Sequence, residues 1–164
     1  MANYLNRPSV FEIATAYEDG NEGKIKQKGK EVYDIYKDLS DDEKSFILRH
    51  PGYAYKFNAN AEKAKRVGRL LKGTVNGYGG AVRHCYWCAL NQVSAGLDSP
   101  LAKEFGDAHE NKTTNDISAK NMDLYNNSVG YYLGNQAIIN EWDEEELLNN
   151  VINAANNGKL KILE

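Results

Sequence analysis

Apolar residues recur every three or four positions along most of this chain, and this spacing is the feature that most restricts its possible folds. In the segment 54–71, for example, Ala61, Ala64, Val67 and Leu71 would share one face of a helix. The alternation of apolar and polar residues that marks a half-buried strand is almost absent. The sequence therefore predicts an all-α fold, as a single compact domain of six or seven helices.

Residues with strong preferences for helix ends delimit several of these helices. Ser40-Asp41-Asp42-Glu43 fits a capping box, in which the serine and glutamate side chains satisfy backbone N–H groups at a helix start. His50 precedes Pro51, whose ring disfavours helical backbone in the preceding residue. We therefore expect His50 at a helix end rather than in a catalytic site. Further helices are expected over residues 10–17, 26–39, 54–71, 81–95, 119–137 and 143–156.

The length and the charge distribution limit the classes of protein to consider. A chain of 164 residues suits one domain with a sizeable core, so we treat 1–164 as a single domain. Residues 1–75, the helical N-terminal part, hold 14 Lys and Arg against 11 Asp and Glu, whereas residues 76–164 hold 6 against 12. The acidic second part suits a cation better than an anion, and the net charge of −3 gives no reason to expect nucleic-acid binding.

No segment of the sequence suggests a membrane span or a disulfide framework. No apolar run approaches the length of about 18 residues that a transmembrane helix needs. The first residues lack a signal-peptide core, so we expect synthesis in the cytoplasm, with export open only to a route that reads no signal peptide. Cys85 and Cys88 are the only cysteines. Their CxxC spacing could hold zinc or do redox chemistry, but it falls inside a helical pattern, which favours two buried, inert thiols.

Three stretches mix apolar residues with polar groups that are costly to bury alone. They are residues 83–91, 105–110 and 122–130, and they carry His, Asp, Glu and Asn side chains. Three such stretches in fewer than fifty residues indicate one shared polar site. Gly130 and Gly134 would let a second helix come close to the polar face of the helix expected over 119–137.

These stretches carry a resemblance to a known group of proteins. Arg-His-x-x-Trp-x-x-Leu at 83–90, Phe-x-Asp-Ala-His-Glu at 105–110 and Met-Asp-Leu-x-Asn-Asn-x-x-Gly at 122–130 recur in order. Together they resemble an uncharacterised bacterial domain family found at the C-termini of polymorphic-toxin and Rhs-type proteins, over about residues 39–163. The resemblance implies a toxin or effector, with a cognate immunity protein as partner. Gly80 stands where that family tends to have an aspartate, so any role of that acid is missing or is supplied by another residue.

The chemistry of the polar residues favours a hydrolytic site with a divalent metal ion. Imidazole and carboxylate groups on separate helices can bind a metal that lowers the pKa of a bound water. The metal-ligand candidates are His84, Asp107, His109 and Asp123. The catalytic candidates are His84, Asp107, His109 and Glu110, with Glu110 as general base. The substrate-binding candidates are Arg83, Trp87, Asn126 and Asn127, with Arg83 suited to a phosphate or an oxyanion. A metal-free version would use His84 as the general base, oriented by Asp107.

The sequence leaves two functions open. The first is a hydrolytic toxin or effector domain that acts on a phosphoester, lipid or cell-wall substrate. The second is a non-enzymatic interaction domain, in which the His, Asp and Asn residues form a buried structural network. The first requires His84 and the later acids to converge on one site.

Overall fold

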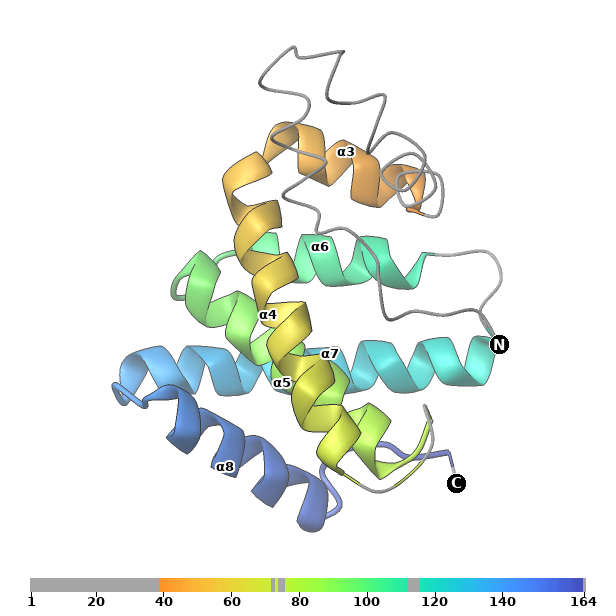
Figure 1. Ribbon diagram of the computed structural model, residues 1–164, viewed down its shortest axis with the longest axis vertical. Coiled ribbons are helices and arrows are strands. Elements are labelled where there is room, and N and C mark those ends of the chain that lie inside the picture. Colours follow the sequence, from red (N-terminus) through yellow and green to blue (C-terminus); the bar gives the residue numbers. More distant parts are fainter. Residues whose placement is uncertain (1–38, 72, 74–75, 112–115, 164) are drawn as a thin grey trace.

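The described part of the protein is a bundle of α-helices. A computed structural model describes residues 39–163 except 72, 74–75 and 112–115, so the helices expected over 10–17 and 26–39 lie almost entirely outside the described residues. Within the described residues the chain forms six helices and no strand (Figure 1), which confirms the all-α prediction. The helices are α3 (Asp41–Arg49), α4 (Pro51–Leu70), α5 (Tyr78–Ala95), α6 (Leu101–Glu110), α7 (Ile117–Ile139) and α8 (Glu144–Asn156).

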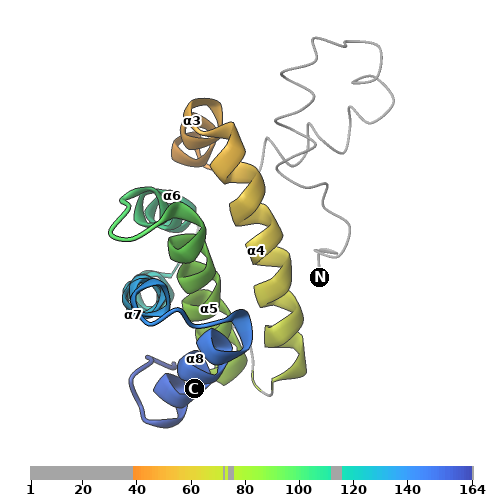
Figure 2. The ribbon, with the colours of Figure 1, turned by 90° about the vertical axis from the view of Figure 1, so that its left-hand side faces the viewer.

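Helix α5 lies at the centre of this bundle. It packs against α4, α6, α7 and α8, and seen from the side it runs between α4 and α7 (Figure 2). Most of its residues are buried, including Ala81, Val82, Tyr86 and Ala89. A helix that is surrounded on all sides must bury polar residues wherever its sequence carries them. The polar residues His84, Asn91 and Gln92 are therefore buried among side chains of the neighbouring helices, whereas Arg83 remains partly exposed.

Several of the predicted helix ends are confirmed, and others are shifted by a few residues. The Ser40 hydroxyl accepts a hydrogen bond from the Glu43 N–H at 3.0 Å, and the Glu43 carboxylate accepts one from the Ser40 N–H at 2.8 Å. Asp143 and Glu146 form a second capping box at the start of α8. His50 ends α3 as expected, but α4 begins directly at Pro51 rather than near residue 54. Proline is well tolerated in the first turn, where its missing N–H would have no helical partner.

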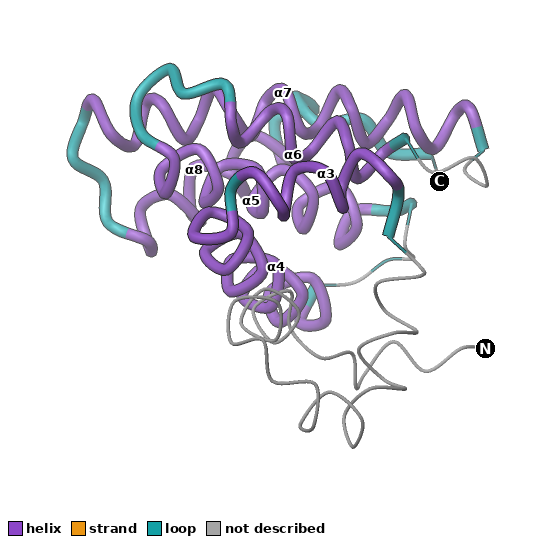
Figure 3. The backbone as a smooth tube through the Cα atoms, turned by 90° about the horizontal axis from the view of Figure 1, so that it is seen from above, coloured by secondary structure: helices purple, strands orange, loops and turns teal. Residues whose placement is uncertain are grey.

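Two glycines allow α7 to lie directly on α5, as the sequence predicted. A Cβ atom at Gly130 would lie 2.3 Å from the carbonyl oxygen of Cys85, and one at Gly134 would lie 2.6 Å from that of Ala89. Both oxygens belong to the backbone of α5 and cannot move without moving the helix. Seen from above, α7 lies on one side of the bundle and α4 on the other (Figure 3). The close packing of α7 on α5 brings polar residues of the two helices within reach of each other.

An aromatic cluster fixes α6 against residues of α3, α4 and α5. The Phe105 ring lies 4.9 Å from the Phe46 ring, 5.5 Å from the Phe57 ring and 5.9 Å from the Trp87 ring, measured between centroids. Such pairs add to the free energy gained by burying the rings. Packing of Phe105 therefore determines which face of α6 is turned inward.

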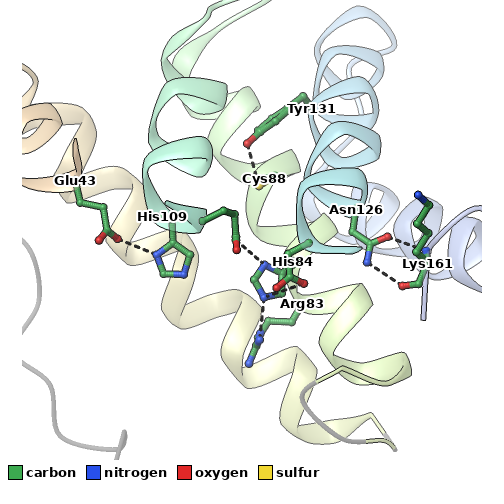
Figure 4. Close-up of polar contacts among 10 residues, drawn as sticks. Glu43, Arg83, His84, Cys88, His109, Asn126, Tyr131 and Lys161 are labelled. Carbon is green, nitrogen blue, oxygen red and sulfur yellow. Dashed lines mark hydrogen bonds and ion pairs between the residues drawn. The ribbon is translucent and has the colours of Figure 1, made fainter. Parts of the chain in front are cut away.

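The C-terminal residues 159–163 form a tail on the body rather than the alternative of a short strand. Leu160 is buried, and the side chain of Asn126 on α7 pairs with the backbone of Lys161 (Figure 4). The amide nitrogen of Asn126 donates to the Lys161 carbonyl at 3.0 Å, and its oxygen accepts from the Lys161 N–H at 2.9 Å. No helix in the described part of the chain is long and apolar enough to cross a membrane.

Candidate functional site

Three ionisable side chains from three helices converge beside α5. His84 comes from the middle of α5, Glu110 is the last residue of α6, and Asp123 lies in the second turn of α7. The Nδ1 atom of His84 is 3.6 Å from Oε1 of Glu110, and its Nε2 atom is 3.6 Å from Oδ1 of Asp123. One ligand atom from each residue lies within 4.8 Å of the other two. We call these three residues the His84 cluster.

The His84 cluster is enclosed, and we call the side on which Asp123 is partly exposed its open side. Its side chains are 10% (His84), 2% (Glu110) and 14% (Asp123) exposed. Glu110 is therefore at the inner end and Asp123 at the outer end. Arg83, which is partly exposed, borders the same side (Figure 4).

The guanidinium of Arg83 fixes the protonation pattern of the imidazole. Nη2 of Arg83 lies 3.0 Å from Nε2 of His84. A guanidinium can only donate hydrogen bonds, so Nε2 must accept with its lone pair. Neutral imidazole then carries its proton on Nδ1, which faces Glu110. The structure therefore presents His84 as a neutral group with its lone pair on the outer side of the cluster.

Burial determines the ionisation of the cluster. Burial lowers the pKa of His84 well below its usual value, and the positive charge of Arg83 lowers it further. Burial, followed by the negative charge of Glu110, raises the pKa of Asp123 to about 7. Burial also lowers the pKa of Arg83, although its guanidinium remains the natural cation of the group. Such perturbed groups gathered at one place are typical of functional sites.

Asn127 faces His84 from α7. It is completely buried, and its side chain partly offsets the lowering of the His84 pKa. Its amide atoms form no well-aligned hydrogen bond with any described residue. Nδ1 of His84 and Oδ1 of Asp123 also lack such a bond. A buried polar group in this state loses free energy, which a bound ligand could recover.

Asp107, predicted as a metal ligand and as the residue that orients His84, does not join the cluster. Its carboxylate pairs with Lys103 one turn earlier on α6, on the solvent side. Residues 105 and 107 differ by about 200° around a helix, so packing Phe105 inward turns Asp107 outward. Glu110 takes the position expected for Asp107.

His109 lies close to the cluster but has a different partner. Its Nδ1 atom is 2.8 Å from the Glu43 carboxylate, which joins α6 to α3 (Figure 4). Its ring also packs edge-on against Trp87 at 5.1 Å. The capping box predicted the contact of Glu43 with Ser40, but no sequence signal indicated that the second oxygen of Glu43 would bind His109.

The other predicted substrate-binding residues on α5 and α7 are structural in this geometry. Trp87 is buried, and its Nε1–H donates to the Phe57 carbonyl at 3.2 Å. Asn126 holds the C-terminal tail. Of the substrate-binding candidates, only Arg83 and Asn127 border the His84 cluster.

The prediction that both cysteines are buried is confirmed. Cys85 and Cys88 are both free and buried. Burial raises the pKa of the Cys85 thiol to about 12 and the pKa of Cys88 well above its usual value. A thiol that keeps its proton is a poor nucleophile and a poor metal ligand.

Comparison with known proteins assigns a family but no activity. The family model described as "Domain of unknown function (DUF6973)" matches residues 44–159. This match covers more than half of the chain, so the protein belongs to that family. It includes all three helices that form the His84 cluster. No curated protein and no solved structure matches the chain.

Proposed function

We propose that this member of the DUF6973 family is a metal-dependent hydrolase of the toxin or effector type, and that His84, Glu110 and Asp123 hold its divalent cation. The convergence of one imidazole and two carboxylates from three helices carries the proposal. The effector context rests on the resemblance of the three motifs to domains at the C-termini of polymorphic toxins.

The donor set suits a catalytic cation. One nitrogen and two oxygen ligands match the preferences of Zn²⁺ and Mn²⁺, and three protein ligands leave a coordination position for water. The cation would supply the activation of that water and would polarise the substrate. Asp123 and Arg83 border the open side, so substrate would approach from there.

The protein's own residues contribute position and charge. Asn127 faces the imidazole from α7, and Arg83 lies where a negative group of the substrate would meet it. In a metal-free version, neutral His84 would act as the general base. Glu110 rather than Asp107 would then orient the imidazole.

A second candidate function is an interaction domain in which the cluster only specifies the packing. The enclosure of His84 and Glu110 favours this alternative. The structural contacts of Trp87, His109 and Asn126 also favour it, because these residues find partners within the protein.

Metal uptake separates the two functions. We expect the purified chain, dialysed against Zn²⁺ or Mn²⁺, to retain about one ion per molecule by elemental analysis. At a free-ion concentration of about 100 times Kd, binding should add about 2.7 kcal/mol to the free energy of unfolding. Asp123→Asn removes a ligand with little change in shape, and we expect it to weaken binding at least about tenfold.

Asp107→Asn is the matched control, because Asp107 belongs to the same stretch but lies outside the cluster. It should leave metal affinity unchanged. Hydrolysis of a phosphodiester, a lipid ester or peptidoglycan should then depend on the added ion and be lost in Asp123→Asn. A chain that takes up no ion, or an equal loss of affinity in both variants, would contradict the proposed site.

A further inference from the structure

We infer that the Arg83 guanidinium donates a hydrogen bond to the metal-binding lone pair of His84 until a metal ion displaces it. The released guanidinium then binds a phosphoester substrate. The inference rests on the proposed metal site and narrows its substrate class.

The lone pair of the His84 imidazole points toward Arg83 and Asp123. The 3.0 Å contact between Arg83 Nη2 and His84 Nε2 requires Nε2 to be the acceptor. Nε2 is also the ring nitrogen that faces Asp123, at 3.6 Å from Oδ1. A metal held by His84 and Asp123 would use the same lone pair that Arg83 uses here.

One lone pair cannot bind a metal ion and accept a hydrogen bond from a guanidinium at the same time. The two cations also repel each other at this distance. Metal binding must therefore move the Arg83 guanidinium away from Nε2. Conversely, Arg83 supplies positive charge beside the two carboxylates when no ion is bound, which lessens their mutual repulsion.

The position of Arg83 indicates where the guanidinium goes. Its side chain is partly exposed, whereas His84 and Glu110 are buried, so the free path leads outward along the open side of the cluster. Among the described residues, the contact with His84 is the only hydrogen bond that the Arg83 guanidinium makes. On release, the guanidinium would present its donors beside a metal and two carboxylates.

The charges at that point select the substrate class. A divalent cation balances the charges of Glu110 and Asp123, and the guanidinium adds one positive charge at the open side. A planar, bidentate donor next to a metal matches the oxygens of a phosphoryl group. Uncharged peptidoglycan bonds or neutral lipid esters would gain much less from this arrangement.

Binding measurements on the full chain test both parts of the inference. By titration calorimetry, Arg83→Met should bind Mn²⁺ about 10- to 100-fold more tightly than the wild type, because no charged hydrogen bond must be broken. Arg83→Lys keeps the charge and is the control for a folding defect in Arg83→Met. Its affinity for Mn²⁺ should lie between those of the wild type and Arg83→Met. Arg66→Met, on the exposed side of α4, is the control and should match the wild type.

The imidazole ¹⁵N spectrum provides a readout that a purely structural role would not change. We expect His84 of the metal-free wild type to carry its proton on Nδ1. Diamagnetic Zn²⁺ takes the place of Mn²⁺ in this experiment and should bind at Nε2. A proton on Nε2 in the metal-free protein would overturn the inference.

Inorganic phosphate is the probe for the substrate class. The metal-loaded wild type should bind phosphate at least about tenfold more tightly than the metal-free protein, and Arg83→Met should lose this coupling. No metal uptake by any variant would refute the proposed function itself. Equal metal affinity in the wild type and Arg83→Met would refute only the role of Arg83 as a competing cation. Tighter metal binding in Arg83→Met without a loss of phosphate coupling would refute only the phosphoester assignment.

Discussion

Asp123 is the residue at which the opposing demands on the site are clearest. Its carboxyl group lies at the outer end of the His84 cluster, with Glu110 and Arg83 acting on it in opposite directions. Burial and Glu110 prevail, and the pKa of Asp123 rises to about 7. Near neutral pH this residue can therefore exchange its proton for a metal ion at small cost.

This shift predicts a pH dependence of stability in the metal-free protein. In the unfolded chain Asp123 loses its proton near pH 4, whereas in the folded chain it keeps the proton until about pH 7. The folded state binds more protons in that window, so Asp123 makes the protein less stable as pH rises from 4 to 7, with no further loss above. Asp123→Asn cannot ionise and should gain about 1–3 kcal/mol relative to the wild type across the window.

Urea unfolding at pH 4.5 and pH 7.5, in the presence of a chelator, measures this difference. His84 has the opposite effect on stability. Because its pKa is lowered in the folded protein, stability increases as pH rises toward the pKa of histidine in the unfolded chain. That contribution is present in both proteins, so the comparison largely removes it. Parallel pH profiles for the two proteins would show that the Asp123 carboxyl group is not perturbed.

At the scale of the elements, the crossing of α5 and α7 brings the site together. His84 and Asp123 come from these two helices, and their distance depends on how closely the helices approach at Gly130 and Gly134. The sequence showed the glycines and the polar faces, so the close approach was predicted correctly. It did not show the register in which α7 lies on α5.

Gly130→Ala should destabilise the protein by about 1–3 kcal/mol. The new methyl group would lie 2.3 Å from the Cys85 carbonyl oxygen, so the helices must separate. This cost exceeds the gain of about 1 kcal/mol that alanine brings to a helix interior. Urea unfolding provides the measurement.

Gly52→Ala is the matched control, because Gly52 is also helical but has no atom near its new methyl group. It should be neutral or slightly stabilising. If Gly130→Ala behaves like Gly52→Ala, the two helices do not pack as closely as described. A destabilised Gly130→Ala should also bind the metal ion more weakly, since the His84–Asp123 distance depends on the same contact.

At the scale of the whole molecule, the effector proposal predicts harm to a bacterial cell. Expression of the wild-type chain should slow bacterial growth in the cytoplasm or, when a signal sequence is added, in the periplasm. His84→Ala should relieve the effect, because it removes the imidazole without touching the packing of Phe105 or the glycines. Growth curves with equal protein levels, checked by blotting, measure the difference.

The compartment in which harm appears would indicate the substrate. Harm confined to the periplasm fits a cell-wall or outer lipid substrate, and harm in the cytoplasm fits a phosphoester there. Equal growth with folded wild-type and His84→Ala proteins in both compartments would count against the toxin proposal. It would leave the metal site to be judged by its own binding measurements.

The sequence by itself determined the helices and several of their ends. These depend on local interactions: the spacing of apolar residues, the capping box at Ser40 and the proline after His50. It also determined that the cysteines would be buried and that α7 could approach a neighbour. The sequence also indicated that Asp107 lies outside the site, because Phe105 and Asp107 face opposite sides of one helix.

Only the tertiary structure decided which polar groups meet. Glu110 reaches His84 because α6 ends where α5 and α7 converge, and Asp123 does so because of the register of α7 on α5. Helix register and rotation follow from side-chain packing between distant segments, such as Phe105 against Phe46 and Phe57. A local sequence pattern does not reveal that packing, because the partners of each polar group depend on how the whole core packs.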